Sequence, residues 1–315
     1  MTDIASKPVT AVARGTAEEE LFLGELIAAG LLVPGGVDGL FGHGAEFEHL
    51  VLQFDRFVTK RGADEHATVV RFPPLISKQH YERTDHLRSF PNLVGCVHSF
   101  SGGDGEHAAL LSAVESGGEW SQFFDASDLV FTPAACYPVY PMATGAIGPD
   151  GLTYDVFSYC FRHEPSRDPA RLQLFRMREY VRIGTPHQCL AFRDKWAGRA
   201  HEIFCEVGLP SDIVVANDPF FGRAGRMLVA NQRDQELKLE VVIPITSTSK
   251  PTACASANCH LDHFSQPFEI RQADGTWAHT ACVGFGMERI ALALFRVHGV
   301  RIGQWPLRVR ALLEL

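Results

Sequence analysis

The spacing of apolar and polar residues divides the chain into a helical first part and a strand-rich second part. Apolar residues recur at helical spacing over Ala17–Leu32, and Leu40–Val58 also favours a helix. A β-rich run follows at Ala67–Phe72, which two prolines close, and then a polar stretch of helical character at Ser77–Ser89. The first part of the chain therefore predicts two long helices, one strand and a third helix.

Strand-like signals dominate from Leu129 onward. Short β segments divided by turns are expected at Leu152–Phe161, Met177–Ile183, Leu237–Ile245 and Trp277–Phe285. Two further helices are expected at Thr185–Val207 and Met287–His298. Sequential strands with few helices between them favour an antiparallel sheet over a doubly wound parallel one. The predicted fold class is α+β, an antiparallel sheet flanked by helices.

Length and composition fit a globular protein with one main domain. The chain has 315 residues, of which 46% are apolar and 21% charged, and no apolar run approaches the roughly 20 residues of a membrane span. We expect a tail and helical region over residues 1–66, a main domain over residues 67–315, and no membrane partner. The segment Met1–Glu20 lacks the basic start and apolar core of a secretory signal, which predicts a cytoplasmic location.

Cysteine spacing and net charge exclude further classes. The eight cysteines form no CxxC pair and are sparse for a chain of this length, so we expect most of them to be reduced and buried. The net charge is −8, from 29 basic and 37 acidic residues, and no long basic run stands out. Proteins that wrap tRNA concentrate positive charge on one face, so this balance argues against a nucleic-acid partner.

Two arginine-bearing motifs carry the candidate chemistry. The first is Phe-Arg-His-Glu at 161–164, followed by Arg-Leu-Gln-Leu-Phe at 171–175; the second is Gly-Phe-Gly-Met-Glu-Arg at 284–289, which runs into an apolar helix. Arginine suits phosphate oxygens because its planar fork of donors stays charged at any working pH. Glycines let the backbone approach a ligand closely, and the unpaired amides of a helix start favour an anion. Either motif alone would also fit an exposed strand with an ion pair or a plain strand-to-helix turn.

Together, these segments resemble motifs 2 and 3 of the class II aminoacyl-tRNA synthetases. The strand, proline and helix order from Ala67 to Ser89 resembles motif 1, the dimer-forming element, and implies a homodimer. The resemblance implies that Arg162 and Arg289 are catalytic, that Phe175 stacks on adenine, and that Mg²⁺ accompanies ATP. The ATP-binding set that it implies is Arg162, Glu164, Arg171, Leu172, Phe175, Lys238, Ala253, Cys254, Ala255, Ser256 and Arg289.

A cysteine stands where ordinary seryl-tRNA synthetases carry a glutamate, at position 136. A thiolate is a strong zinc ligand. With Glu179 and Cys282, Cys136 resembles the Zn²⁺ site of the atypical, archaeal-type seryl-tRNA synthetases. Three protein ligands leave the fourth tetrahedral position for the amine of a substrate amino acid. The alternative is that both cysteines are small buried residues and Glu179 is a charge at a strand edge.

A second set of metal-binding residue types competes with this site: Cys254, Cys259, His260 and His263. By the same resemblance, however, their segment lines the nucleotide and substrate pocket. The substrate-binding residues that the resemblance implies are Ala135, Glu240 and Asn258. Glu240 is also a candidate Mg²⁺ ligand, although Thr252 stands where the family usually has a further glutamate.

The motifs occupy roughly residues 70–300, and neither the long N-terminal arm of seryl enzymes nor an anticodon domain is recognisable. This pattern resembles the amino acid:[carrier protein] ligases, truncated relatives of the atypical seryl enzymes. The resemblance implies that ATP activates a small amino acid as its adenylate, which then passes to the phosphopantetheine thiol of a carrier protein. Glycine is the preferred substrate, because a crowded zinc pocket excludes larger side chains, with alanine and then serine next. No tRNA partner is expected.

An insertion around residues 195–225 is expected to dock the carrier protein. Its cationic residues could meet an acidic helical partner: Arg193, Lys195, Arg199, Arg223 and Arg226. Two other functions stay open, a compact aminoacyl-tRNA synthetase and a nonenzymatic paralogue that senses an amino acid. The arginines in both motifs favour an enzyme over a sensor.

Overall fold

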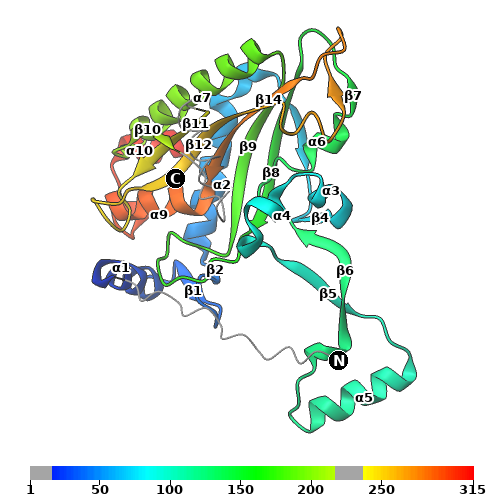
Figure 1. Cartoon of the computed structure of the whole chain (residues 1–315). Coiled ribbons are helices and arrows are strands. Elements are labelled where there is room, and N and C mark those ends of the chain that lie inside the picture. Colours follow the sequence, from blue (N-terminus) through cyan, green and yellow to red (C-terminus); the bar gives the residue numbers. More distant parts are fainter. Residues whose placement is uncertain (1–15, 217–236) are drawn as a thin grey trace.

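The computed structural model describes residues 16–216 and 237–315, and its centre is a seven-stranded sheet (Figure 1). The strand order is β10-β11-β12-β14-β9-β8-β3. The strands are β3 (Thr68–Arg71), β8 (Leu152–Phe161), β9 (Leu174–Gly184), β10 (Asp212–Ala216), β11 (Lys238–Ile243), β12 (Thr252–Leu261) and β14 (His279–Gly286). Neighbours pair antiparallel, except that β3 lies parallel to β8 at one edge. The predicted α+β class with an antiparallel sheet is confirmed.

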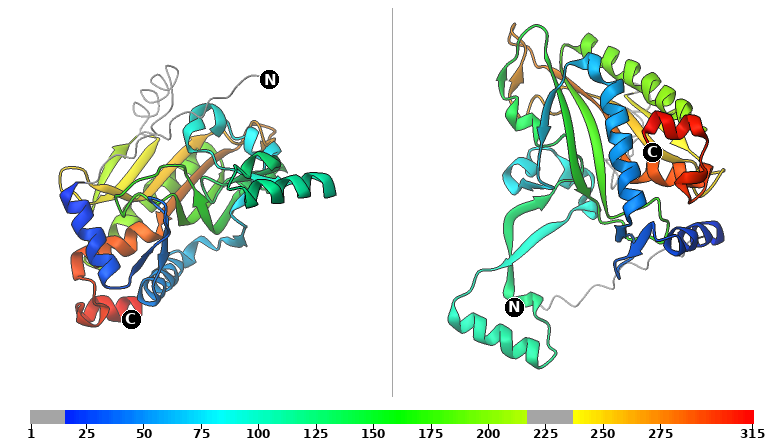
Figure 2. Two further views of the ribbon diagram at one scale, coloured as in Figure 1. Left: turned by 90° about the horizontal axis from the view of Figure 1, so that it is seen from below. Right: turned by 180° about the vertical axis from the view of Figure 1, so that it is seen from behind.

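Helices cover one face of this sheet (Figure 2). They are α2 (Ala45–Arg61), α7 (Pro186–Glu206), α9 (Met287–His298) and α10 (Leu307–Leu313), with α1 (Ala17–Ala28) beside them. The helix α7 begins where predicted, because Thr185 accepts a hydrogen bond from the Gln188 amide and Pro186 occupies the first turn. Its inner face buries Trp196 and Phe204 against Phe285 of β14. The main hydrophobic core therefore lies between these helices and the sheet.

The sequence prediction for the N-terminal part needs three corrections. The first helix ends at Ala28, and the chain then forms a hairpin of β1 (Leu32–Pro34) and β2 (Phe41–His43). The stretch Leu40–Val58 is therefore not helical from its start; α2 begins only after Gly44, where a Cβ would lie 2.0 Å from the Gly30 carbonyl oxygen.

The predicted third helix is also wrong as a single element. It divides into β4 (Leu75–Ser77), α3 (Lys78–Glu82) and α4 (His86–Ser89). The break lies at Asp85, whose φ of 60° places it in the left-handed region that interrupts a helix. This segment therefore forms a short strand and two short helices.

A protruding arm extends away from the sheet (Figure 1, Figure 2). It consists of β5 (Cys96–Phe100) and β6 (Phe124–Phe131), which pair antiparallel, with α5 (Asp104–Glu115) at the far end. Near the body, β6 also pairs with β4. Every residue of α5 is exposed or half-buried, so the helix buries no apolar stripe that periodicity could have revealed.

The arm is followed by α6 (Val139–Met142) and by β7 (Gly145–Ala146), which pairs with β13 (Ile270–Arg271).

All eight cysteines are free, and six of them are buried, as predicted. Within residues 16–216 and 237–315, no helix is both long and apolar enough to cross a membrane.

The expected insertion at 195–225 falls partly on a helix that packs on the main sheet and partly on an edge strand of that sheet. Its described part consists of the end of α7 and strand β10. Lys195 Nζ lies 2.9 Å from Asp64 Oδ2, and Arg199 Nη1 lies 2.8 Å from Asp64 Oδ1. The first cationic residues of the expected docking surface are therefore engaged in ion pairs within the chain, as is Arg193 with Asp194. Arg223 and Arg226 lie outside the described residues.

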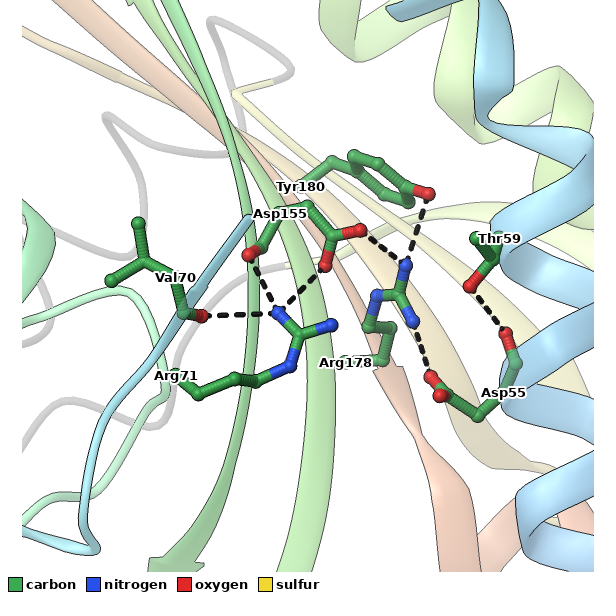
Figure 3. A network of polar contacts seen from close by, with 7 residues as sticks. All are labelled: Asp55, Thr59, Val70, Arg71, Asp155, Arg178 and Tyr180. Carbon is green, nitrogen blue, oxygen red and sulfur yellow. Dashed lines mark hydrogen bonds and ion pairs between the residues drawn. The ribbon is translucent and has the colours of Figure 1, made fainter. Parts of the chain in front are cut away.

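A buried ion-pair network fixes α2 against the sheet (Figure 3). Arg178 of β9 has no exposed side-chain surface and pairs with Asp55 of α2 and with Asp155 of β8 at 2.5 Å. Arg71 of β3 reaches Asp155 from the other side at 3.1 Å. Four elements meet at this point, so α2, which lies within the predicted region 1–66, shares its packing with the main domain.

Candidate active site

The sheet face opposite the helices carries a cavity of about 590 Å³. Polar side chains from neighbouring strands form the floor of this cavity. Lys238, Asn258 and Cys282 lie in one row across β11, β12 and β14. A second row contains Glu240, Ser256, Gly284 and Glu179. Side chains alternate along a strand, so both rows face the cavity while the residues between them enter the helix-covered core.

Most residues of the predicted site line this one cavity: Cys136, Arg162, Glu164, Leu172, Phe175, Glu179, Lys238, Glu240, Ala253, Cys254, Ala255, Ser256, Asn258, Cys282 and Arg289. Ala135 and Arg171 contact it through neighbours, since the Ala135 amide donates to Glu179 and Arg171 pairs with Glu164. The fold thus brings together motifs that are far apart in the sequence.

The two motif arginines are held by backbone carbonyl groups. Arg162 donates from Nε to the Pro133 oxygen at 3.0 Å, and its guanidinium carbon lies 5.4 Å from the centre of the Phe175 ring. Arg289 donates to the oxygens of Ala170 at 2.8 Å and Ala253 at 3.0 Å. Carbonyl groups orient a guanidinium without neutralising it. Both arginines therefore remain positive charges that an anion in the cavity can meet.

A buried triad forms the candidate metal site. Cys136 lies in the turn between β6 and α6, Glu179 on β9 and Cys282 on β14. One ligand atom from each lies within 4.8 Å of the other two. The Ala135 amide donates to Glu179 Oε1 at 2.7 Å, which orients the carboxylate. Two sulfur donors and one carboxylate oxygen are a donor set that zinc accepts, with one position left open.

The electrostatics of the triad also fit a divalent cation. Burial raises the pKa of Glu179 to about 8. The hydrogen bond between the two thiols, together with burial, raises the pKa of Cys136, while the same bond lowers the pKa of Cys282. Three buried acidic groups repel one another when ionised, and a bound cation would offset that repulsion. The residues therefore fit zinc.

The rival metal cluster does not assemble. Among the residues that the structure describes, Cys136, Glu179 and Cys282 are the one group of potential ligands within reach of a common ion. Cys254 and Cys259 belong to the helix-side core, and His260 instead approaches Cys282, with Nε2 at 3.6 Å from the sulfur. His260 thus lies next to the triad, in a position that the sequence did not reveal.

The candidate magnesium ligand has a cation partner of its own. Lys238 Nζ lies 3.1 Å from Glu240 Oε1, with both side chains largely buried at the cavity floor. Sequence reasoning also missed Glu288, which is buried at the start of α9 and pairs with Arg176 at 2.6 Å. Arg176 continues to Glu48 of α2 at 2.7 Å, so the start of the motif 3 helix is tied to α2.

Comparison with known proteins places this site in a family. The chain is 44% identical over 282 residues to amino acid–[acyl-carrier-protein] ligase 1 of Bradyrhizobium diazoefficiens, an alignment that covers 89% of the chain and 86% of that relative. The chain belongs to the amino acid–[acyl-carrier-protein] ligases. The resemblance stated from the motifs is thereby confirmed. No protein-family model matches the ligase.

More distant similarities agree with the fold. The ligase is 28% identical over 193 residues to the type-2 serine–tRNA ligase of Methanopyrus kandleri, which covers 56% of the chain and 36% of that relative. The solved structure of M. kandleri seryl-tRNA synthetase in complex with A. aeolicus tRNASec aligns with a TM-score of 0.80 at 20% identity, over 98% of the ligase and 62% of that chain. This likeness shows a class II synthetase fold.

Proposed function

We propose that this ligase activates a small amino acid with ATP and transfers it to the phosphopantetheine thiol of a carrier protein. The observation that carries the proposal is the convergence of Arg162, Arg289 and the Cys136–Glu179–Cys282 triad on one cavity. The names of the relatives support a carrier protein as acceptor. The cysteines are all free, which agrees with a reducing compartment such as the cytoplasm.

The first chemical step forms the aminoacyl adenylate. A carboxylate oxygen of the amino acid attacks the α-phosphorus of ATP, and the bond to pyrophosphate breaks. Arg162 stabilises the charge on the α-phosphate, while Arg171 and Arg289 bind the departing phosphates and Phe175 stacks on adenine. Glu240 is the proposed ligand of Mg²⁺, which would offset part of the phosphate charge when bound. In the absence of phosphate, Arg171 and Glu240 have partners in Glu164 and Lys238.

The second step transfers the amino acid. The carrier thiol loses its proton to solvent, its sulfur attacks the adenylate carbonyl carbon, and AMP leaves with the mixed-anhydride oxygen. No cysteine of the ligase is acylated. When held by Cys136, Glu179 and Cys282, zinc supplies an electrophilic position for the neutral amine of the substrate.

Glycine is the proposed substrate, ahead of alanine and serine. Bulky groups surround the triad, because Tyr140 stacks on Phe264 with ring centres 4.2 Å apart beside Cys136. On the other side, a Cβ on Gly284 would lie 3.1 Å from Met177 Cε. A pocket walled in this way excludes large side chains by contact, whereas it rejects a smaller one only weakly.

We also propose that the ligase forms a homodimer through the segment that resembles motif 1. Strand β3 is an edge of the central sheet, and Val69 on it is 63% exposed. An exposed apolar side chain on an edge strand is a suitable surface for a second copy.

Amino-acid-dependent exchange of pyrophosphate into ATP tests the central proposal. Zinc-loaded protein is assayed with each proteinogenic amino acid, in wild type and in Cys136→Ser. Cys189→Ser is the matched control, because Cys189 is equally buried but lies in α7, in the helix-side core. We expect exchange with glycine that Cys136→Ser abolishes and Cys189→Ser retains. Folded, zinc-bound wild type without exchange for any amino acid would overturn the proposal.

The transfer step needs its own assay. Labelled glycine is incubated with the ligase, ATP and a carrier protein with or without its phosphopantetheine group. We expect label on the modified carrier alone, released by hydroxylamine as a thioester would be. Label on tRNA in place of the carrier would show that the acceptor is different.

A further inference from the structure

We propose that His260 and Tyr140 are positioning residues that donate hydrogen bonds to the two thiolates of the metal site, with Thr280 holding the second imidazole nitrogen of His260. This inference rests on the proposed zinc site and adds a second layer of residues around it. It does not require either side chain to touch the metal or the substrate.

A β-bulge places His260. Between β12 and β14, Cys259 pairs with Ala281 and Leu261 pairs with Thr280, so His260 is one extra residue in β12. The next residue, Leu261, has a φ of 52°, a left-handed conformation that is costly for a leucine. Bulges of this kind redirect a side chain next to a functional site. Here the bulge places the imidazole with Nε2 3.6 Å from Cys282 Sγ.

Thr280 holds the second imidazole nitrogen of His260. His260 Nδ1 lies 3.1 Å from Thr280 Oγ1, and Thr280 is fully buried. A metal-bound thiolate can only accept a hydrogen bond. Zinc binding therefore selects the tautomer with the proton on Nε2, and Nδ1 then accepts from the Thr280 hydroxyl, which rotates to donate.

A second donor already reaches the same sulfur. Asn258 Nδ2 lies 3.6 Å from Cys282 Sγ, in the row of residues that crosses the cavity floor. With His260 on the other side, the Cys282 thiolate would accept from two neutral groups. Such hydrogen bonds fix the direction of a ligand and offset part of its negative charge.

Tyr140 plays the corresponding part at Cys136. Its side chain is fully buried, yet its hydroxyl has no hydrogen-bond partner within the described residues. Buried hydroxyl groups rarely remain unpaired. The stack on Phe264 fixes the ring in the same cluster as Cys136, and burial together with the nearby thiol raises the pKa of Tyr140. A thiolate at Cys136 would give this hydroxyl its acceptor.

Charge explains why the donors are needed. Two thiolates and one carboxylate around a divalent ion leave one net negative charge in a buried site. Neutral donors can offset that charge without competing for the metal, whereas a cation would repel it. We therefore expect the donors to raise zinc affinity and to hold the open position toward the substrate.

Zinc affinity, measured by competition with a chromophoric chelator, tests the inference. We expect His260→Leu and Tyr140→Phe each to weaken zinc binding by about 10- to 100-fold. Thr280→Val should weaken it as well, because it removes the donor to Nδ1 at nearly constant volume, and Thr280→Ser should restore it. His201→Leu is the matched control, since His201 bonds Ser211 at 2.9 Å on α7, outside the cavity lining, and should leave affinity unchanged.

The cobalt-substituted protein supplies a second measurement. Thiolate-to-cobalt charge-transfer absorption reports on the sulfur donors themselves, and we expect it to shift in His260→Leu and Tyr140→Phe but not in His201→Leu. Wild-type affinity and spectra in His260→Leu, Tyr140→Phe and Thr280→Val would overturn the inference while leaving the metal site intact. A wild-type protein that binds no zinc would overturn the proposed function as well. If His260→Leu does not fold, Tyr140→Phe and the two Thr280 variants decide.

Discussion

At the scale of single residues, the site combines charges that the fold has already oriented. Arg162 and Arg289 donate to backbone carbonyl oxygens at the cavity, so neither guanidinium must be released from a carboxylate before it meets a phosphate. Preorganised donors stabilise developing charge without reorganisation during the reaction. The fork of Arg289, which spans two carbonyl groups, is the feature that a lysine cannot reproduce.

Substitution of Arg289 tests this point. We expect Arg289→Lys to lower the rate of glycine-dependent pyrophosphate exchange by roughly 100-fold, because one set of oriented donors to the phosphates is lost. Zinc content should remain that of wild type, since Arg289 does not contact the triad. Steady-state exchange kinetics provide the measurement, and a rate within about threefold of wild type would contradict the role of Arg289.

His43 is expected to make the folded protein less stable as the pH falls. Burial, as the largest cause, lowers the pKa of His43, which stacks on Phe47 and lies 2.9 Å from Glu48. The unfolded chain keeps the ordinary value near 6.5, so it binds a proton more readily than the folded protein does. The contribution of His43 is therefore complete above about pH 6.5 and is lost as the pH falls toward the folded pKa.

Between pH 7.5 and pH 5.5 we expect His43→Gln to lose less free energy of unfolding than wild type, because the variant has no imidazole at position 43. Urea unfolding at both pH values measures the difference. His66→Gln, at an exposed histidine after α2, serves as the control. An equal loss in His43→Gln and wild type would show that other groups govern this range.

The triad and both arginines were predicted from the resemblance of their segments to class II synthetase motifs, in which a cysteine at position 136 replaces the usual glutamate. Their neighbours could not be predicted in the same way. His260 was weighed with Cys254 and Cys259 as a cluster, but one extra residue in β12 sets it beside Cys282 instead. A bulge is defined by the pairing of two strands, so the residue pattern of a single strand does not reveal it.

At the scale of elements, buried ion pairs join α2 to the sheet in addition to the apolar core. Arg178 is enclosed and joins Asp55 and Asp155, and Arg71 adds a partly exposed contact to the same Asp155 (Figure 3). Removing one member of a buried pair leaves the other charge without compensation, which costs more than the pair itself contributes.

We expect Arg178→Met to lower the free energy of unfolding by about 3–5 kcal/mol, since it leaves Asp55 and Asp155 without their buried partner. Arg71→Met is the control from the same network and should cost under about 1 kcal/mol, because its side chain is partly solvated. Denaturant unfolding compares the two variants. Similar losses in the free energy of unfolding for both variants would mean that the burial of Arg178 does not increase its contribution to stability.

Helices and strands were predicted correctly where packing on the sheet requires apolar residues at a regular spacing, as in α7, α9, β8 and β9. The prediction failed where packing does not select the pattern. The arm helix α5 buries no side chain, and the predicted helix Ser77–Ser89 breaks at Asp85, where the backbone is left-handed and the chain lines the cavity. The helix predicted at Arg193–Val207 lies within α7, and its Lys195 and Arg199 pair with Asp64. Carrier docking at this helix stays a prediction.

At the scale of the whole molecule, the central sheet ends in two unlike edges. Strand β10 closes one edge with Ile213, Val214 and Val215 exposed to intermediate degrees, and β3 closes the other with Val69 exposed. Strand β3 is parallel to its neighbour and is fixed behind by the Arg178 network, so its position is rigid. A rigid edge with an exposed apolar residue suits a symmetric contact with a second copy.

A charge introduced on β3 tests whether this strand forms the interface of the proposed dimer. If β3 lies at the interface between two copies, Val69→Lys places two like charges near the symmetry axis and should convert a dimer to a monomer at micromolar concentration. Val215→Lys makes the same change at the opposite edge and should leave the dimer intact. Light scattering coupled to size-exclusion chromatography gives the mass of each species. A monomeric wild type, or a dimer that Val215→Lys disrupts and Val69→Lys does not, would place the association elsewhere and remove β3 from it.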